Sequence, residues 1–192
     1  MPLELRADLE QAALLARAAA GDRQAAEALT DLIAPRLLRF AARMLGDLAE
    51  AEDVTQEAML RLWRMAPDWQ PGAAQPSTWV FRVASNLCTD RLRRRRPMQE
   101  AMPDLPDPAA GADAGLMAQA RARALEAALL ALPERQRQAV ILRHLEELTN
   151  PEIGAIMMIG VEAVESLTAR GKRNLSAILA GQRDALGYDD DT

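Results

Sequence analysis

The chain has 192 residues, a formal net charge of −5 at pH 7, and six aromatic residues within a hydrophobic fraction of 49%. Ala and Leu, which favour helices, are abundant, whereas strand-favouring runs of Val, Ile, Tyr and Thr are nearly absent. The single cysteine, Cys88, excludes a disulfide framework, so we expect a reducing, cytoplasmic location. We find no signal-peptide pattern and no apolar run near the roughly 20 residues that cross a bilayer, so we expect no membrane insertion. These features predict an all-α protein.

Charge is unevenly distributed along the chain. Residues 82–96 carry six Arg and one acid, Asp90, whereas residues 97–117 carry four acids and no base. The last nine residues, 184–192, carry four Asp and no base. A basic segment on an acidic chain is typical of a nucleic-acid site on a surface that discourages non-specific contacts.

The first half of the chain begins with three predicted helices. Apolar residues recur at helical spacing over 7–19 and again over 22–46, where Pro35 is expected to break or kink the helix. A third apolar stripe begins at Asp47 and ends at Pro67. Asp residues at these starts are favourable helix caps, which strengthens the prediction.

Residues 67–77 contain three Pro and one Gly and are predicted to form a loop. Ser77 is expected to cap a helix over 78–95, which Pro97 should terminate. The apolar face of this helix would contribute four residues to a core: Val80, Ala84, Leu87 and Cys88.

From residue 98 the composition changes to Pro, Gly and Asp, which predicts a flexible acidic linker over 98–117. A tether with no further role is an equally open interpretation of this segment. We predict two small helical domains, 1–97 and 118–192, the second with an acidic tail. The helices expected after the linker cover residues 117–131, 134–147, 150–157 and 161–180.

The second domain contains a pattern typical of a helix-turn-helix. Thr149 and Glu152 match a capping box at the start of the short helix 150–157, and residues 158–160 form a turn before the longer helix 161–180. Helical hairpins with a purely structural role are common, so this pattern alone does not establish that the second domain binds DNA. The longer helix would offer DNA one set of side chains for bases and phosphates: Glu162, Glu165, Ser166, Ala169, Arg170, Lys172 and Arg173.

The helix predicted over 78–95 carries a polar face whose residues follow one another at spacings of three or four. An aromatic ring beside amide and guanidinium groups suits single-stranded bases, and the arginines 93–96 would neutralise phosphates. Each piece also has a structural explanation: Trp79 as core, Asp90 as partner of Arg94, and the arginines as a solvated helix end. The combination favours nucleic acid. The face comprises Trp79, Arg82, Asn86, Asp90, Arg93 and Arg94.

Three ordered segments together resemble the extracytoplasmic-function group of sigma factors over nearly the whole chain. Residues 51–63 (AEDVTQEAMLRLW) are similar to the family's helix that binds core RNA polymerase. Residues 77–94 are similar to its helix for melting and reading the −10 element. Residues 132–137 (LPERQR), with 152–154 (EIG) and the helix from 161, are similar to the −35-binding domain.

This resemblance implies a transcription initiation factor, not an enzyme, that binds core RNA polymerase and promoter DNA, both duplex and single-stranded. The loop 68–78, which includes Trp69, matches the place where relatives receive a base flipped from the non-template strand at a cost of a few kcal/mol. The acidic linker matches a segment that threads towards the polymerase active-site channel. Control by an anti-sigma factor is expected, and no cofactor or metal. The implied polymerase-binding residues are Asp53, Gln56, Glu57, Leu60 and Trp63.

The turn of the helix-turn-helix departs from the family pattern. Met158 stands where relatives commonly carry Gly, and Gly160 where a capping Ser is common. If residue 158 needs a left-handed backbone, Met costs about 1–2 kcal/mol there. Glu165 and Leu167 occupy positions that many relatives fill with Lys or Arg, which weakens phosphate attraction and leaves the −35 preference open.

Other functional classes fit the residues less well. One His, His144, and one Cys cannot assemble a common metal site, and no phosphate loop or catalytic carboxylate pair stands out. The main alternative is a sigma-like decoy that sequesters an anti-sigma factor without starting transcription. A helix-turn-helix repressor would need a dimerisation element or ligand pocket, and neither is evident in the sequence.

Overall fold

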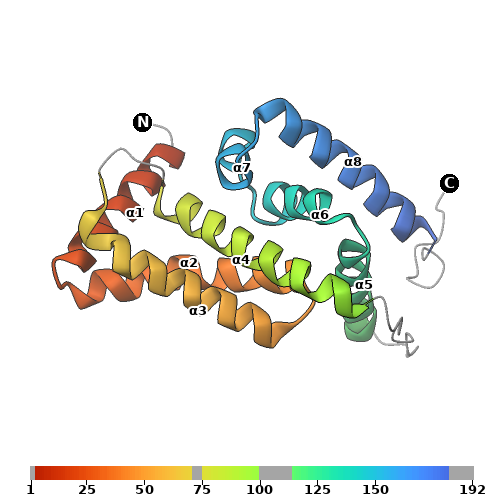
Figure 1. Ribbon diagram of the computed structural model, residues 1–192, viewed down its shortest axis with the longest axis horizontal. Coiled ribbons are helices and arrows are strands. Elements are labelled where there is room, and N and C mark those ends of the chain that lie inside the picture. Colours follow the sequence, from red (N-terminus) through yellow and green to blue (C-terminus); the bar gives the residue numbers. More distant parts are fainter. Residues whose placement is uncertain (1–2, 71–74, 100–113, 182–192) are drawn as a thin grey trace.

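The computed structural model describes residues 3–70, 75–99 and 114–181, and the regular elements within these ranges are all helices (Figure 1). The prediction of an all-α fold is confirmed. The first domain contains α1 (Leu3–Ala19), α2 (Arg23–Leu45), α3 (Leu48–Met65), the short 3-10 helix η1 (Ala66–Asp68) and α4 (Pro76–Gln99). The second contains α5 (Ala114–Leu130), α6 (Glu134–Val140), the π-helical turn η2 (Ile141–Leu145), α7 (Asn150–Met157) and α8 (Val161–Ala180).

Helix α2 is the centre of the first domain, because α1, α3 and α4 all pack against it. Its apolar stripe, including Ile33, Leu37 and Phe40, is fully buried. The ring of Phe40 meets the ring of Phe81 on α4 edge-to-face, with centroids 5.5 Å apart. Removal of this apolar surface from water is the main force that holds the helices together.

The helix starts follow local sequence signals. The Asp22 side chain accepts a hydrogen bond from the Ala25 amide at 3.1 Å and caps α2, and Asp47 caps α3 through the Glu50 amide at 3.0 Å. Between these helices Gly46 adopts a left-handed backbone with φ 67°, which ends α2 and reverses the chain. The predicted starts at Asp22 and Asp47 are therefore confirmed.

Two expectations at prolines and caps are wrong, and a third is wrong in part. Pro35 does not break α2, because it lies on the exposed side of a helix that continues to Leu45 and forfeits only one backbone hydrogen bond. A kink at Pro35 stays a prediction. Helix α4 begins at Pro76 and not after a Ser77 cap, since proline suits the first turn of a helix. It also runs past Pro97 to Gln99, so the helix tolerates the loss of the one backbone hydrogen bond that residue 97 cannot donate.

The second domain is built on α8, which packs against α5, α6 and α7. Gly171 allows α8 to cross α6 closely: a Cβ there would lie 2.6 Å from a methyl group of Val140 and 3.1 Å from the Gln136 carbonyl oxygen. Among the apolar residues of α7, the turn and the start of α8, Ile153, Ile156 and Val164 are buried and Ile159 is half-buried.

The two domains touch, since α7 packs against α4 and both α5 and α6 contact α2 (Figure 1). The predicted limits at 97/98 and 117/118 fall inside α4 and α5 and stay predictions. Most of the predicted linker, residues 100–113, and the acidic tail lie outside the described residues. Among the described residues, no helix is both long and apolar enough to cross a membrane.

Candidate nucleic-acid interface

Helix α4 separates a buried side from a polar exposed side, as predicted. Val80, Ala84 and Cys88 are buried, and Leu87 is half-buried. Burial raises the pKa of the Cys88 thiol to about 12, so this cysteine is an inert core residue. On the other side Arg82, Asn86, Arg93 and Arg94 are exposed and Asp90 is half-buried, so the helix holds a row of polar groups in reach of a ligand.

Two tryptophans lie together at the start of this face. Trp69, just after η1, and Trp79, in the first turn of α4, are both half-buried and meet edge-to-face with ring centroids 6.4 Å apart. The predicted structural role of Trp79 as core and its role as a stacking surface are both compatible with this half-burial. Residues 71–74 of the predicted base-binding loop lie outside the described residues.

The arginine-rich end of α4 is divided between two tasks. Arg91 donates to the Glu50 carbonyl oxygen, and Arg95 donates to the Leu45 carbonyl oxygen at 2.8 Å. Arg95 also forms a 2.7 Å ion pair with Glu50 and lies 3.7 Å from Asp47. These two arginines therefore hold α4 against the turn between α2 and α3, where helix α3 begins with acidic groups.

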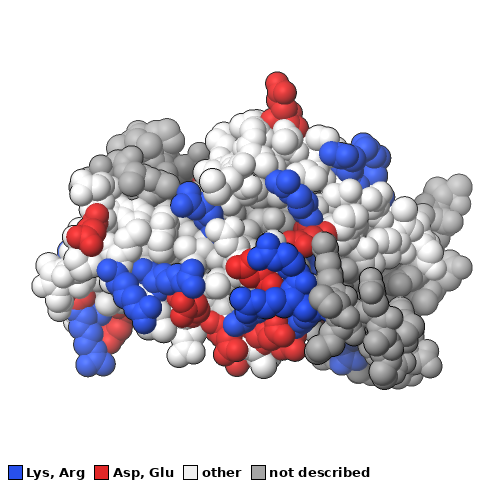
Figure 2. All heavy atoms as spheres, viewed as in Figure 1, with Lys and Arg blue, Asp and Glu red and all other residues white. Residues whose placement is uncertain are grey.

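The sequence did not reveal this structural role, because adjacent arginines look alike until their neighbours are known. Arg93 pairs with Asp90 at 2.7 Å, not Arg94 as the structural alternative expected. Figure 2 shows blue and red side chains interleaved over the part of this face where α3 and α4 lie. The basic segment is therefore not a uniform positive stripe: of its arginines with described side chains, 91, 93 and 95 lie beside acidic groups, whereas 82 and 94 are exposed.

The predicted reading face of α8 is open to solvent. Glu165 accepts a hydrogen bond from the Asn150 side chain at 3.3 Å, which links the two helices of the motif. The capping box of Thr149 and Glu152 is present as predicted. Met158 has a left-handed backbone, with φ 55°, so the steric cost of a Cβ at this turn applies. The predicted DNA-facing residues with polar side chains are all exposed: Glu162, Glu165, Ser166, Arg170, Lys172 and Arg173.

The candidate docking face on α3 is exposed along most of its length. Asp53 and Gln56 are exposed, Leu60 is 42% exposed, and Glu57 is half-buried and paired with Arg61 at 2.8 Å. A single exposed leucine among polar groups is common on protein surfaces, so this face is open to a partner but its composition does not identify one.

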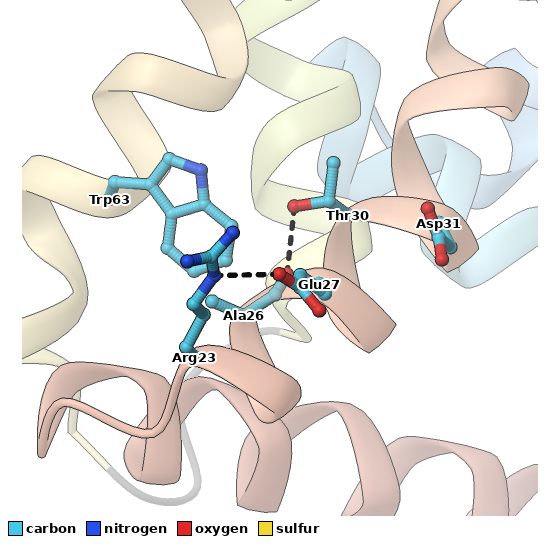
Figure 3. A pocket seen from close by; sticks show the side chains of 6 residues that line it. All are labelled: Arg23, Ala26, Glu27, Thr30, Asp31 and Trp63. Atoms are coloured by element: carbon cyan, nitrogen blue, oxygen red, sulfur yellow. Dashed lines mark hydrogen bonds and ion pairs between the residues drawn. The ribbon is translucent and has the colours of Figure 1, made fainter.

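Trp63, at the end of this face, lines an open hollow of about 640 Å³ between α2 and α3 (Figure 3). On the α2 side of the hollow, Arg23 forms an ion pair with Glu27, four residues further along the same helix, at 2.8 Å. Trp63 is half-buried, so one part of the indole packs on the domain and another part remains accessible. In the described part of the chain, no group of three or more His, Cys, Asp or Glu could hold a metal ion.

Comparisons with known proteins agree with both halves of this arrangement. The family models for Sigma-70 region 2 and Sigma-70, region 4 match residues 29–97 and 122–175. The chain is 36% identical over 170 residues to the ECF RNA polymerase sigma factor SigE of Mycolicibacterium smegmatis. This match covers 84% of the chain but only 65% of SigE, which is less than two thirds of that protein's length. It is 30% identical over 179 residues to the ECF RNA polymerase sigma factor SigM of Mycobacterium tuberculosis, covering 91% of this chain and 87% of SigM. The sigma factor RpoE, solved in complex with the anti-sigma factor NepR from Bartonella quintana, has a similar fold, with a TM-score of 0.64 at 22% identity over 80% of this chain and 96% of that chain.

Proposed function

Because the chain belongs to the extracytoplasmic-function group of RNA polymerase sigma factors, which are initiation factors and not enzymes, we propose that it directs core RNA polymerase to promoters with −35 and −10 elements. The observation that carries this proposal is the exposed polar face of α4. Arg82, Asn86 and Arg94 project to solvent from a helix whose other side is core, so they are free to grip an opened strand.

The first step proposed is docking of α3 on the polymerase. Asp53, Gln56 and Leu60 supply an exposed face with an apolar centre, and Trp63 extends it. Arg61 holds Glu57 in place through an ion pair. Preordered side chains lower the entropy cost of association, which favours this face as the docking surface.

The second step is reading of DNA by both domains. The N-terminal turns of α8 would enter the major groove at the −35 element, with Arg170, Lys172 and Arg173 near phosphates. The face of α4, with the tryptophan pair Trp69 and Trp79 at one end, would take bases of the −10 strand as the duplex opens. Aromatic faces stabilise unstacked bases, which supports assigning melting to this domain.

We further propose that an anti-sigma factor controls the chain. The sigma factor RpoE, whose fold this chain shares, is described in complex with the anti-sigma factor NepR. The described domains of this chain have exposed faces on α3, α4 and α8 that a protein inhibitor could cover.

Run-off transcription with purified core polymerase tests the proposed function on a promoter taken from upstream of the chain's own gene. A promoter-dependent transcript is expected from the wild-type chain and a much weaker one from an Arg82→Ala, Asn86→Ala variant. Arg123→Ala, an exposed arginine on α5 outside both reading faces, is the control and should transcribe normally. Binding to an anti-sigma protein without any transcript would reject the proposal and select the decoy.

A further inference from the structure

Gln11 on α1 holds the first turn of α4 from 66 residues away. Its side chain is buried, and its Oε1 accepts a hydrogen bond from the Ser77 amide at 3.2 Å. Ser77 is buried as well, so water does not readily replace this acceptor. A buried amide that loses its partner is unfavourable, and the start of α4 is therefore tied to its seat on α1.

The acceptor at the start of α4 comes from another helix, unlike the acceptors at α2 and α3. There the Asp directly before the helix, Asp22 or Asp47, accepts the bond from a first-turn amide. At α4 the first residue, Pro76, has no amide hydrogen, and the Ser77 amide is among the first-turn donors without an acceptor inside the helix. The position of this turn therefore depends on a tertiary contact.

Helix α1 packs on both segments that carry the tryptophan pair, because it contacts η1 as well as α4 (Figure 1). Trp69 directly follows η1, and Trp79 lies two residues after Ser77 in the first turn of α4. The two rings meet edge-to-face at an interplanar angle of 85°. This geometry is set by where η1 and the first turn of α4 lie on α1, and Gln11 supplies a directional bond to that turn.

We infer that Gln11 is a positioning residue for reading of the −10 strand: its bond to Ser77 fixes the first turn of α4 and thereby the Trp69–Trp79 pair. The inference rests on the function proposed above, which assigns unstacked bases to these tryptophans. It adds α1, a helix outside both reading faces, to the parts of the chain that decide which bases are accepted. Recognition groups discriminate only when the residues around them hold them in place.

A purely stabilising role for Gln11 makes a different prediction. Loss of stability lowers the amount of folded chain, so transcription from every promoter falls by the same factor. Displacement of the tryptophan rings instead changes the ratio of transcripts from promoters that differ by one −10 base. This ratio does not depend on how much of the chain is folded, so partial unfolding cannot imitate the expected result.

Run-off transcription by the holoenzyme tests the inference on the promoter upstream of the chain's own gene, with each −10 base replaced in turn. Gln11→Met keeps a side chain of similar length but removes the acceptor, and should reduce discrimination between these promoters by up to about tenfold. Gln11→Glu keeps an oxygen acceptor at a helix start, where negative charge is favoured, and should retain most of the discrimination. Gln24→Met, the same change at an exposed glutamine of α2, should match the wild-type chain.

Hydrogen exchange of the Ser77 amide gives a second readout that needs no polymerase. In the full chain this amide should exchange about tenfold faster in Gln11→Met and at the wild-type rate in Gln24→Met. Unchanged discrimination in Gln11→Met, an equal loss in Gln24→Met, or an unaltered Ser77 exchange rate overturns the inference. If the wild-type chain gives no transcript, the proposed function fails and the −10 role of Gln11 fails with it, whereas Ser77 exchange still shows whether Gln11 holds the start of α4.

Discussion

Arg95 donates a hydrogen bond to the carbonyl oxygen of Leu45 at 2.8 Å, across 50 residues of sequence. This hydrogen bond satisfies a carbonyl in the last turn of α2, where helix hydrogen bonds run out, and places a cation at the negative end of the helix dipole. One member of a run of four arginines therefore belongs to the fold of the first domain, while its neighbour Arg94 is exposed.

The division of the arginine run predicts opposite effects for neighbouring substitutions. Arg93→Ala with Arg94→Ala should weaken promoter opening and reduce its salt dependence. The slope of log affinity against log salt concentration should become shallower by about 0.7 for each phosphate that is no longer neutralised, because the strand is single there. Core polymerase binding should not change, and the free energy of unfolding should move by about 0.5 kcal/mol or less. Filter binding of open complexes between low and moderate salt, with urea unfolding, measures both quantities.

Arg95→Ala is the matched comparison. It removes the bond to Leu45 and the ion pair with Glu50, so the chain should become less stable by about 2 kcal/mol with little change in the salt slope. If Arg95→Ala flattened the slope as much as the Arg93, Arg94 pair, the separation of structural from DNA-facing arginines would be wrong.

The crossing of α6 and α8 depends on the absence of a side chain at position 171. Gly171→Ala would place a methyl group 2.6 Å from a Val140 methyl and 3.1 Å from the Gln136 carbonyl, and backbone cannot yield as easily as a side chain. The expected cost is about 1–3 kcal/mol, measured by thermal or urea unfolding. Gly181→Ala, whose Cβ would meet its nearest neighbour at 3.6 Å, is the control and should be close to neutral. Equal stability of the two variants would contradict the close-crossing argument.

Burial of Glu146 predicts a pH dependence of stability with a defined sign. Because burial raises its pKa above the ordinary 4.5 in the folded chain, the folded state binds this proton more tightly than the unfolded state. The carboxylate's cost therefore appears as the pH rises above about 4.5, and it is fully present above the folded pKa. The positive charges that face this carboxylate and partly oppose the effect of burial are those of Arg36, Arg39 and Arg43.

Urea unfolding of the wild-type chain and Glu146→Gln at pH 7 and pH 5 measures this effect. The stability difference should shift in favour of the wild-type chain as the pH falls, since its carboxylate then begins to take up the proton that burial favours. Glu147→Gln, which removes the same charge from an exposed position, controls for changes in overall charge. A shift towards Glu146→Gln on acidification would mean that attraction to the arginines outweighs desolvation.

Local signals in the sequence were sufficient to predict the helices and the starts of α2, α3 and α7, although not the start of α4. Asp22, Asp47 and the Thr149–Glu152 capping box all act within three or four residues, so the sequence alone specifies them. The exposed faces of α4 and α8 also follow from helical spacing, because a helix with one apolar side must turn the other to solvent.

The contacts that the sequence did not reveal are those between distant segments. Arg36 and Glu146 are 110 residues apart, and nothing in the pattern around either residue indicates a partner in the other domain. Pro35 does not break α2 for a related reason: this proline lies on a solvent side where a missing hydrogen bond costs little, and that depends on what surrounds α2. In both cases the outcome depends on contacts with distant parts of the chain, which the local sequence pattern does not reveal.

The left-handed backbone at Met158 provides the last prediction. With φ 55° and ψ 47°, this residue bears the steric cost of a Cβ close to the following carbonyl, and its side chain is 74% exposed, so little packing offsets that cost. Met158→Gly should therefore raise the free energy of unfolding by about 1 kcal/mol, somewhat less than the backbone cost because glycine also gains entropy in the unfolded chain. Met158→Ala removes the same exposed side chain but keeps the Cβ, so its melting temperature should not rise. A thermal melt in which the glycine and alanine variants shift together would show that strain at this turn does not limit the stability of the second domain.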